Sequence, residues 1–196
     1  MENQHANDFN QEASLKLIYE MIESAKTRIG KNYFYYLFWG YLVVLTCLLE
    51  VFLIKVIGYP RHYLVWTFLM PLGAIITSVF YYRQQESSKS RTFIGTAMGY
   101  LWSGWLVSFI ILLAFLWMSA QFQLIIPTVL AMYGLAVFVS GGMVKFRLLM
   151  GGSVLAWTAA VISFFVPYLG QLLILAGAAI FSHIIPGYVL KSRSKA

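Results

Sequence analysis

The sequence predicts an all-helical, polytopic membrane protein: a bundle of six transmembrane helices preceded by an amphipathic helix at the membrane interface. Three observations lead to this fold class. The chain of 196 residues is 60% hydrophobic and 11% charged, whereas soluble domains are about 45–50% apolar and about 25% charged. It contains six apolar runs of about 20 residues each. Its basic residues gather in alternate connections between these runs.

The N-terminal tail, residues 1–32, is mostly polar and holds the predicted amphipathic helix over residues 14–29. Apolar side chains recur there at steps of three and four residues, the spacing of one helix face: Leu15, Ile18, Ile22, Ala25 and Ile29. The helix either lies on the cytoplasmic membrane surface or docks on a membrane or cytoplasmic protein partner. The apolar run that follows is too long for a signal peptide, so we expect the tail to remain in the mature protein.

The predicted transmembrane domain covers residues 33–190. A hydrocarbon core about 30 Å thick requires about 20 apolar residues of helix. Six segments meet this requirement: 34–54, 64–82, 98–118, 123–142, 149–169 and 172–190. A basic tail, residues 191–196, follows the last span. The connections are short apart from the polar stretch 83–91, so we expect no extramembrane domain.

The distribution of Lys and Arg predicts the orientation of the spans. If the N-terminus is cytoplasmic, twelve of the 14 basic residues lie inside and two, Lys55 and Arg61, lie outside. Because basic residues in short connections favour the cytoplasmic side, we expect both termini in the cytoplasm. This scattered pattern also accounts for the net charge of +7. The basic residues form no long tract, and we expect no nucleic-acid partner.

Two segments of the chain resemble one another. Residues 36–49 and 100–113 share seven identities in fourteen positions, including Gly40 with Gly104. Three helical hairpins repeated in parallel would give such a match. The alternative is chance identity between two leucine-rich spans that each begin at an aromatic belt. Mitochondrial carriers also have three two-span repeats, but the chain lacks their Pro-x-acidic-x-x-basic signature, and that family is excluded.

The stretch from Ser140 to Val154 places two Gly-Gly pairs around Lys145 and Arg147. A phosphate-binding loop follows a strand and ends in Gly-Lys-Ser/Thr before a helix, and this context is absent. We therefore interpret the stretch as a hairpin between the fourth and fifth spans. The second interpretation is that Lys145 and Arg147 form a shallow site for an anion or a lipid headgroup.

Three motifs together resemble a family of small, uncharacterised bacterial six-span inner-membrane proteins. They are "LKLIYEMIESAK" in the tail, "FWGYLV" in the first span and "VKFRLLMGG" in the hairpin. The resemblance covers most of the chain, and its motifs are hydrophobic and structural. It implies a multi-pass protein of the bacterial inner membrane and no particular activity.

Glu50 falls inside the first predicted span, where an ionisable group is a candidate functional residue. Thr46 and Cys47 precede it, so we expect this face of the helix to look into the bundle. One interpretation is that Glu50 reaches the outer interface and pairs with a nearby basic group, namely Lys55, Arg61 or His62. The other is a proton or cation site.

His183 lies close to the middle of the sixth span, beside Pro186 and Gly187, which should break the helix. The ring is either a proton relay or gate beside a broken helix, or a neutral side chain bonded to a neighbouring carbonyl. Pro71 in the second span and Pro127 in the fourth are further candidate hinges. These two prolines should leave the carbonyls of Thr67 and Gln123 without a helical partner.

The spans contain few residues that could perform chemistry. Glu50 is the only acidic residue in the predicted spans, and Asp8 is the only aspartate of the chain. Paired-carboxylate catalysis, zinc sites and magnesium–phosphate chemistry each require more ligands. The sequence therefore predicts no enzyme, no metal site and no cofactor.

Two functions are consistent with these features of the sequence. The first is a non-catalytic integral membrane protein that acts as a regulatory or scaffolding subunit. The alternative is a small transporter or channel for an ion or small solute, with Glu50 and His183 as its coupling groups.

Overall fold

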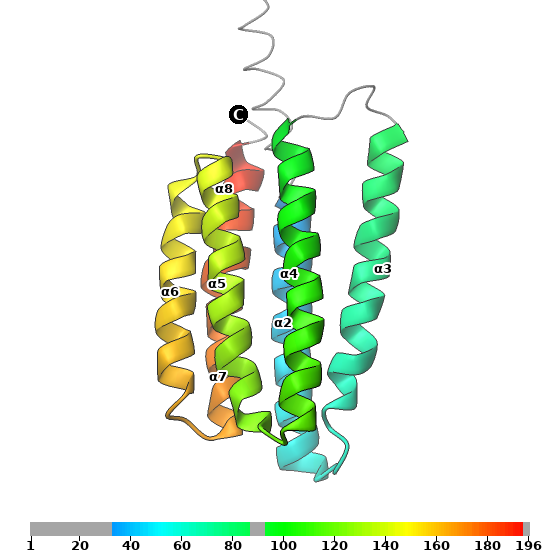
Figure 1. Cartoon of the computed structure of the whole chain (residues 1–196), viewed down its shortest axis with the longest axis vertical. Helices are drawn as coiled ribbons and strands as arrows, with labels where there is room; N and C mark the ends of the chain where they lie inside the picture. The colour runs from blue at the N-terminus through cyan, green and yellow to red at the C-terminus, as the bar shows by residue number, and fades with distance from the viewer. Residues whose placement is uncertain (1–32, 87–92, 194–196) are drawn as a thin grey trace, which may run out of the picture.

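The structure, a computed structural model, describes residues 33–86 and 93–193. Every regular element in these two ranges is helical, as predicted (Figure 1). The elements are α2 (Tyr33–Phe52), the π turn η1 (Leu53–Ile57), α3 (Leu64–Glu86), α4 (Phe93–Met118), the 3-10 turn η2 (Phe122–Leu124), α5 (Ile125–Met143), α6 (Arg147–Ser163), α7 (Tyr168–Ala179), the π turn η3 (Ile180–Ile184) and α8 (Ile185–Arg193). The predicted amphipathic helix, residues 14–29, lies outside the described residues.

Four helical stretches are long and apolar enough to cross a membrane: Tyr33–Ile57, Gly95–Met118, Phe122–Met143 and Tyr168–Ser192. Two shorter apolar helices, Leu64–Phe80 and Arg147–Ser163, cover the second and fifth predicted spans. The predicted end of the fifth span at residue 169 was wrong, because residues 164–167 form a turn. Pro167, in an extended conformation with φ −63° and ψ 158°, is the N-cap of α7.

From α2 to α7 each helix runs opposite to the one before it, and α8 continues α7 in the same direction through η3 (Figure 1). The first described helix packs against the last ones, since α2 contacts α7, η3 and α8. Helices α5 and α6 form a closely packed hairpin, and α6 also contacts α7 and η3. Helix α3 packs on α2, and α4 packs on α5. The buried core therefore lies among α2 and α5–α8.

Two glycines allow α2 and α6 to approach the π turn η3. A Cβ atom added at Gly40 of α2 would lie 2.9 Å from Cβ of His183, and one added at Gly152 of α6 would lie 2.8 Å from Cα of Ser182. Real Cβ atoms do not approach other atoms so closely, so each position requires glycine for this packing. The π turn is therefore fixed between two helices.

The segments that resemble one another in sequence have different surroundings. Gly40 is buried against η3, whereas Gly104 on α4 is exposed and a Cβ there would meet no described atom within 4 Å. Tyr36 packs against the ring of His183, while its counterpart Tyr100 is 76% exposed. The shared residues thus do not place α2 and α4 in equivalent environments.

Substitution Gly152→Ala should lower the free energy of unfolding by about 1–3 kcal/mol, because the new methyl group must displace the backbone at Ser182. Unfolding of the purified protein in detergent by SDS or heat provides the measurement. The adjacent Gly151 is a matched control, since a Cβ there would meet nothing within 4 Å. Gly151→Ala should leave stability unchanged or slightly raised. Equal losses in both variants would contradict the close approach of α6 to η3.

Candidate functional site

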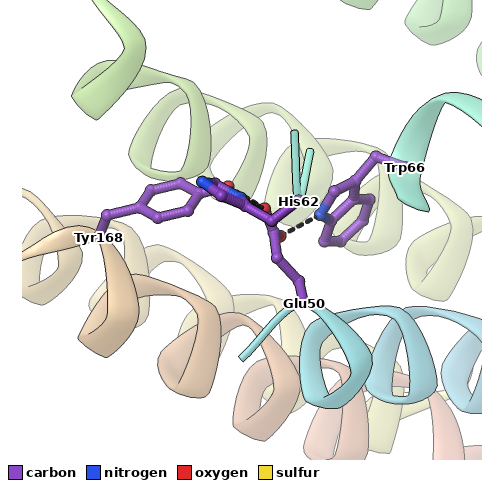
Figure 2. Close-up of polar contacts among 4 residues, drawn as sticks. All are labelled: Glu50, His62, Trp66 and Tyr168. Carbon is purple, nitrogen blue, oxygen red and sulfur yellow. Dashed lines mark hydrogen bonds and ion pairs between the residues drawn. The ribbon is translucent and has the colours of Figure 1, made fainter. Parts of the chain in front are cut away.

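Glu50 lies near the end of α2, and its side chain is fully buried. The carboxylate receives three hydrogen bonds (Figure 2). Nδ1 of His62 lies 2.6 Å and the hydroxyl of Tyr168 2.9 Å from Oε1, and Nε1 of Trp66 lies 2.5 Å from Oε2. Because an ionised carboxylate can only accept, Nδ1 of His62 carries the hydrogen of its bond. The carboxylate therefore receives a donor from each of three side chains.

The three donors come from segments that the local sequence brings to one end of the molecule. His62 lies in the turn at residues 60–63, Trp66 in the first turn of α3, and Tyr168 is the first residue of α7. Two helices therefore begin at the carboxylate, and the positive ends of their dipoles favour its charge. Glu50 joins α2 to α3 and α7 at the end of the bundle where α2 ends and where α3 and α7 begin (Figure 1).

The structure selects one of the partners expected for Glu50. His62 pairs with it, whereas Lys55 and Arg61 are exposed. The carboxylate does not reach the surface, since the side chain is 0% exposed. The prediction that this face of the helix looks into the bundle is confirmed, because Thr46 and Cys47 are also fully buried.

His183 is buried in the π turn η3, shortly before Pro186. The predicted helix break thus takes the form of a π turn, a feature found often at functional sites. The imidazole contacts the hydroxyl of Tyr133 on α5 and packs against the ring of Tyr36 on α2, with the ring centroids 5.7 Å apart. The ring therefore has a hydroxyl partner from another helix in addition to a hydrogen bond with the neighbouring backbone at Ser182.

The hydrogen bonds around His183 form a directed chain. The hydroxyl of Ser182 donates to the carbonyl of Ala178 at 2.6 Å, and it lies 2.8 Å from the hydroxyl of Tyr133. Since the Ser182 hydrogen is already used, Tyr133 donates to Ser182 and accepts from the ring of His183. The chain runs from His183 through Tyr133 and Ser182 to the backbone, and each bond polarises the next.

Gln171, which was not predicted from the sequence as a site residue, is also a buried polar side chain. Its Nε2 lies 3.1 Å from the carbonyl of Gln123, 3.0 Å from that of Ser163 and 3.1 Å from that of Val166. The carbonyl of Gln123 is the one that Pro127 leaves without a helical donor. Gln171 thereby holds together the start of α5, the end of α6 and the turn before α7. In the sequence, the signal for this buried contact was a glutamine inside an apolar run.

The predicted hinges differ from one another in the structure. Pro127 lies in the first turn of α5, where helical N–H groups have no intrahelical partner, so it interrupts no helix. Pro71 lies inside α3, which continues to Glu86. Pro186 is buried after η3, and Gly187 is a contact point, because a Cβ there would lie 2.8 Å from Cδ2 of Leu37.

Residues 144–146 join α5 to α6, and the hairpin interpretation of this stretch is confirmed. Lys145 occupies the left-handed region with φ 52°, and both Lys145 and Arg147 are exposed. The anion or lipid-headgroup interpretation of this pair stays a prediction. Over residues 33–86 and 93–193, no group of three or more His, Cys, Asp and Glu side chains could hold a metal ion.

Substitution Tyr168→Phe should reduce stability by about 1.5–3 kcal/mol, because it removes a donor from a buried charged acceptor. Thermal unfolding in detergent measures the change. Tyr59→Phe is the matched control, since Tyr59 is exposed, and its effect should stay within about 0.5 kcal/mol. A Tyr168→Phe variant as stable as the unaltered protein would show that the hydroxyl does not support Glu50.

Substitution Tyr133→Phe should reduce stability by about 1–3 kcal/mol, because the buried ring of His183 loses its hydroxyl partner and the hydroxyl of Ser182 loses one of its two bonds. The same unfolding measurement applies. Tyr100→Phe on α4 provides the control at an exposed tyrosine. If both variants unfold like the unaltered protein, the hydrogen-bond chain does not contribute to folding.

No family model, curated protein or solved structure matches the chain. The case for its function therefore rests on the geometry of the buried polar side chains.

Proposed function

We propose that the protein is a non-catalytic, multi-pass membrane subunit with a regulatory or scaffolding role. One observation carries this proposal: the buried polar side chains form bonds between helices. Glu50 joins α2 to α3 and α7, and Gln171 joins the segments around α5, α6 and α7. His183 joins η3 to α5. Each of these groups is engaged in holding the bundle together, which favours an architectural role over transport or catalysis.

Six membrane passes with both termini in the cytoplasm complete this proposal. Helices α2 and α4 run in the same direction (Figure 1), and α3, which follows α2 in the sequence and runs opposite to both, supplies the return pass in our proposal. The 23 residues of α3 give a length of about 35 Å at 1.5 Å per residue, enough for a hydrocarbon core. Helix α6 is shorter and runs antiparallel to α5.

The charges of the described residues support this orientation. Arg83 lies in the last turn of α3, Lys145 and Arg147 at the α5–α6 turn, and Lys191 in α8 near its end. These segments lie at the same end of the molecule, and η1 with Lys55 lies at the other (Figure 1). An excess of Lys and Arg marks the cytoplasmic side. The end with the α5–α6 turn is therefore the cytoplasmic end in our proposal.

We assign the contact surface of the subunit to the segment 14–29 together with this basic end. The segment precedes α2, whose first residue lies at the same end of the bundle (Figure 1). An amphipathic helix presents an apolar face that can enter the groove of a partner. Exposed basic side chains at Arg83, Lys145 and Arg147 would steer an acidic partner toward it.

The test compares two triple variants of the segment in the full-length protein. One replaces the apolar face, Leu15→Ser, Ile18→Ser and Ile22→Ser, and the matched control replaces polar positions, Lys16→Ser, Glu20→Ser and Glu23→Ser. Each protein is isolated from its native membrane in mild detergent, and co-purifying proteins are quantified by mass spectrometry. We expect a stoichiometric partner that the apolar-face variant loses and the control keeps.

Two results would contradict this proposal. The unaltered protein could emerge without a stoichiometric partner, or the apolar-face variant could retain the partner in full. Gel filtration of every variant checks that the bundle remains folded, so that loss of the partner reports on the segment itself.

A second candidate is a small proton-coupled transporter or channel. The chain from His183 through Tyr133 to Ser182 favours it, because three proton-carrying groups are connected inside the bundle. In liposomes with a pH-sensitive dye, Glu50→Gln or His183→Ala should then abolish a proton-linked flux that Tyr100→Phe leaves intact. Absence of flux in the unaltered protein, or equal flux in all variants, would remove this candidate.

A further inference from the structure

His62 connects the buried carboxylate to the surface of the protein. Its side chain is 27% exposed, whereas that of Glu50 is 0% exposed. Nδ1 donates to Glu50 at 2.6 Å, and Nε2 has no hydrogen-bond partner among the described residues. The ring therefore offers one nitrogen to the carboxylate and keeps the other for a proton from outside.

The charge of Glu50 has one close basic partner in the described part of the chain. The groups around it are Cys47 on α2, Trp66 on α3 and Tyr168 on α7, none of which carries positive charge. Lys55 on η1 and Arg61 in the turn are exposed, and neither forms an ion pair with the carboxylate. Neutralisation of the buried carboxylate thus depends on the protonation state of His62.

We propose that the Glu50–His62 pair is a proton-operated clasp that tightens the attachment of α3 to α2 and α7. Uptake of one proton at Nε2 gives the ring a positive charge while the Nδ1–H bond to Glu50 stays in place. The bond then joins two opposite charges, so that a Coulomb attraction is added to a hydrogen bond that the ionised carboxylate already strengthens. Histidine is the side chain whose charge changes between about pH 5 and about pH 8.

The attachment of α3 should also weaken at a pH low enough to protonate Glu50. Protonation of Glu50 itself would convert one carboxylate oxygen from an acceptor into a donor. His62, Trp66 and Tyr168 would then donate to a neutral group, and their bonds would lose the negative charge that strengthens them. The attachment is therefore tightest when His62 is charged and Glu50 is ionised.

The chain carries its own reporter of this attachment. Cys47 is its single cysteine, is fully buried and precedes Glu50 by about one helical turn. It packs in the same apolar cluster as Trp66 and Tyr168. Movement of Trp66 or Tyr168 away from Glu50 would expose the thiol, so its rate of modification measures how often the clasp opens.

The experiment measures the reaction of Cys47 with dithiodipyridine, a reagent that also reacts with thiols in mild acid. The full chain is held in lipid nanodiscs, and each rate is divided by that of free cysteine at the same pH. We expect the normalised rate to be about five- to tenfold lower at about pH 5.5 than at about pH 8. Equal rates, or a faster reaction at the lower pH, would overturn the proposal.

Two variants decide whether His62 is the group responsible for the pH dependence of the Cys47 reaction. His62→Gln should abolish the difference between the two pH values, and His5→Gln is the matched control that should retain it. Glu50→Gln should also lose the difference, but the decision does not depend on whether that variant folds. A His62→Gln protein that keeps the full pH dependence would overturn the clasp. The Glu50–His62 clasp does not depend on the proposed subunit role of the protein.

Discussion

A carboxylate that is removed from water must receive donors from the protein, and this requirement determines how one end of the bundle is built. An unpaired buried charge costs several kcal/mol. Glu50 meets the requirement with three hydrogen bonds from the turn before α3, from α3 and from α7. The starts of α3 and α7 must therefore lie beside the end of α2. The position of α3 depends strongly on this site, since α2 is the helix that α3 mainly packs on among the described residues.

The interior is organised by a small number of polar bonds and glycine contacts. Helices in lipid gain little from the hydrophobic effect when they associate, so packing and hydrogen bonds decide which helices meet. Gly40 and Gly152 bring α2 and α6 against η3, and Tyr133 holds the ring of His183 from α5. Gln171 performs the same task at the start of α7. Together they define a packed unit of α2 and α5–α8, with α3 and α4 at its margin.

The sequence predicted the helical class and the apolar segments well, because span length and hydrophobicity are local properties. It also identified Glu50 and the inward face of Thr46 and Cys47. It could not identify Tyr168 as a partner of Glu50 or Tyr133 as a partner of His183, because these pairs are separated by 118 and 50 residues. The sequence could not show that Pro127 lies in the first turn of a helix, because this depends on where the helix begins. Pro127 follows closely on Ile125, the first residue of α5, and therefore falls in the first turn of that helix.

The bonds to Glu50 also set an order in which the protein can be completed during synthesis. His62 and Trp66 follow Glu50 by 12 and 16 residues, so both emerge with the α2–α3 hairpin. Tyr168 follows by 118 residues, which a ribosome adding about 5–20 residues per second requires roughly 6–24 s to reach. During this interval two of the three donors to Glu50 are available, both from the α2–α3 hairpin. The buried carboxylate can therefore gain its third donor only after the first residue of α7 has been synthesised.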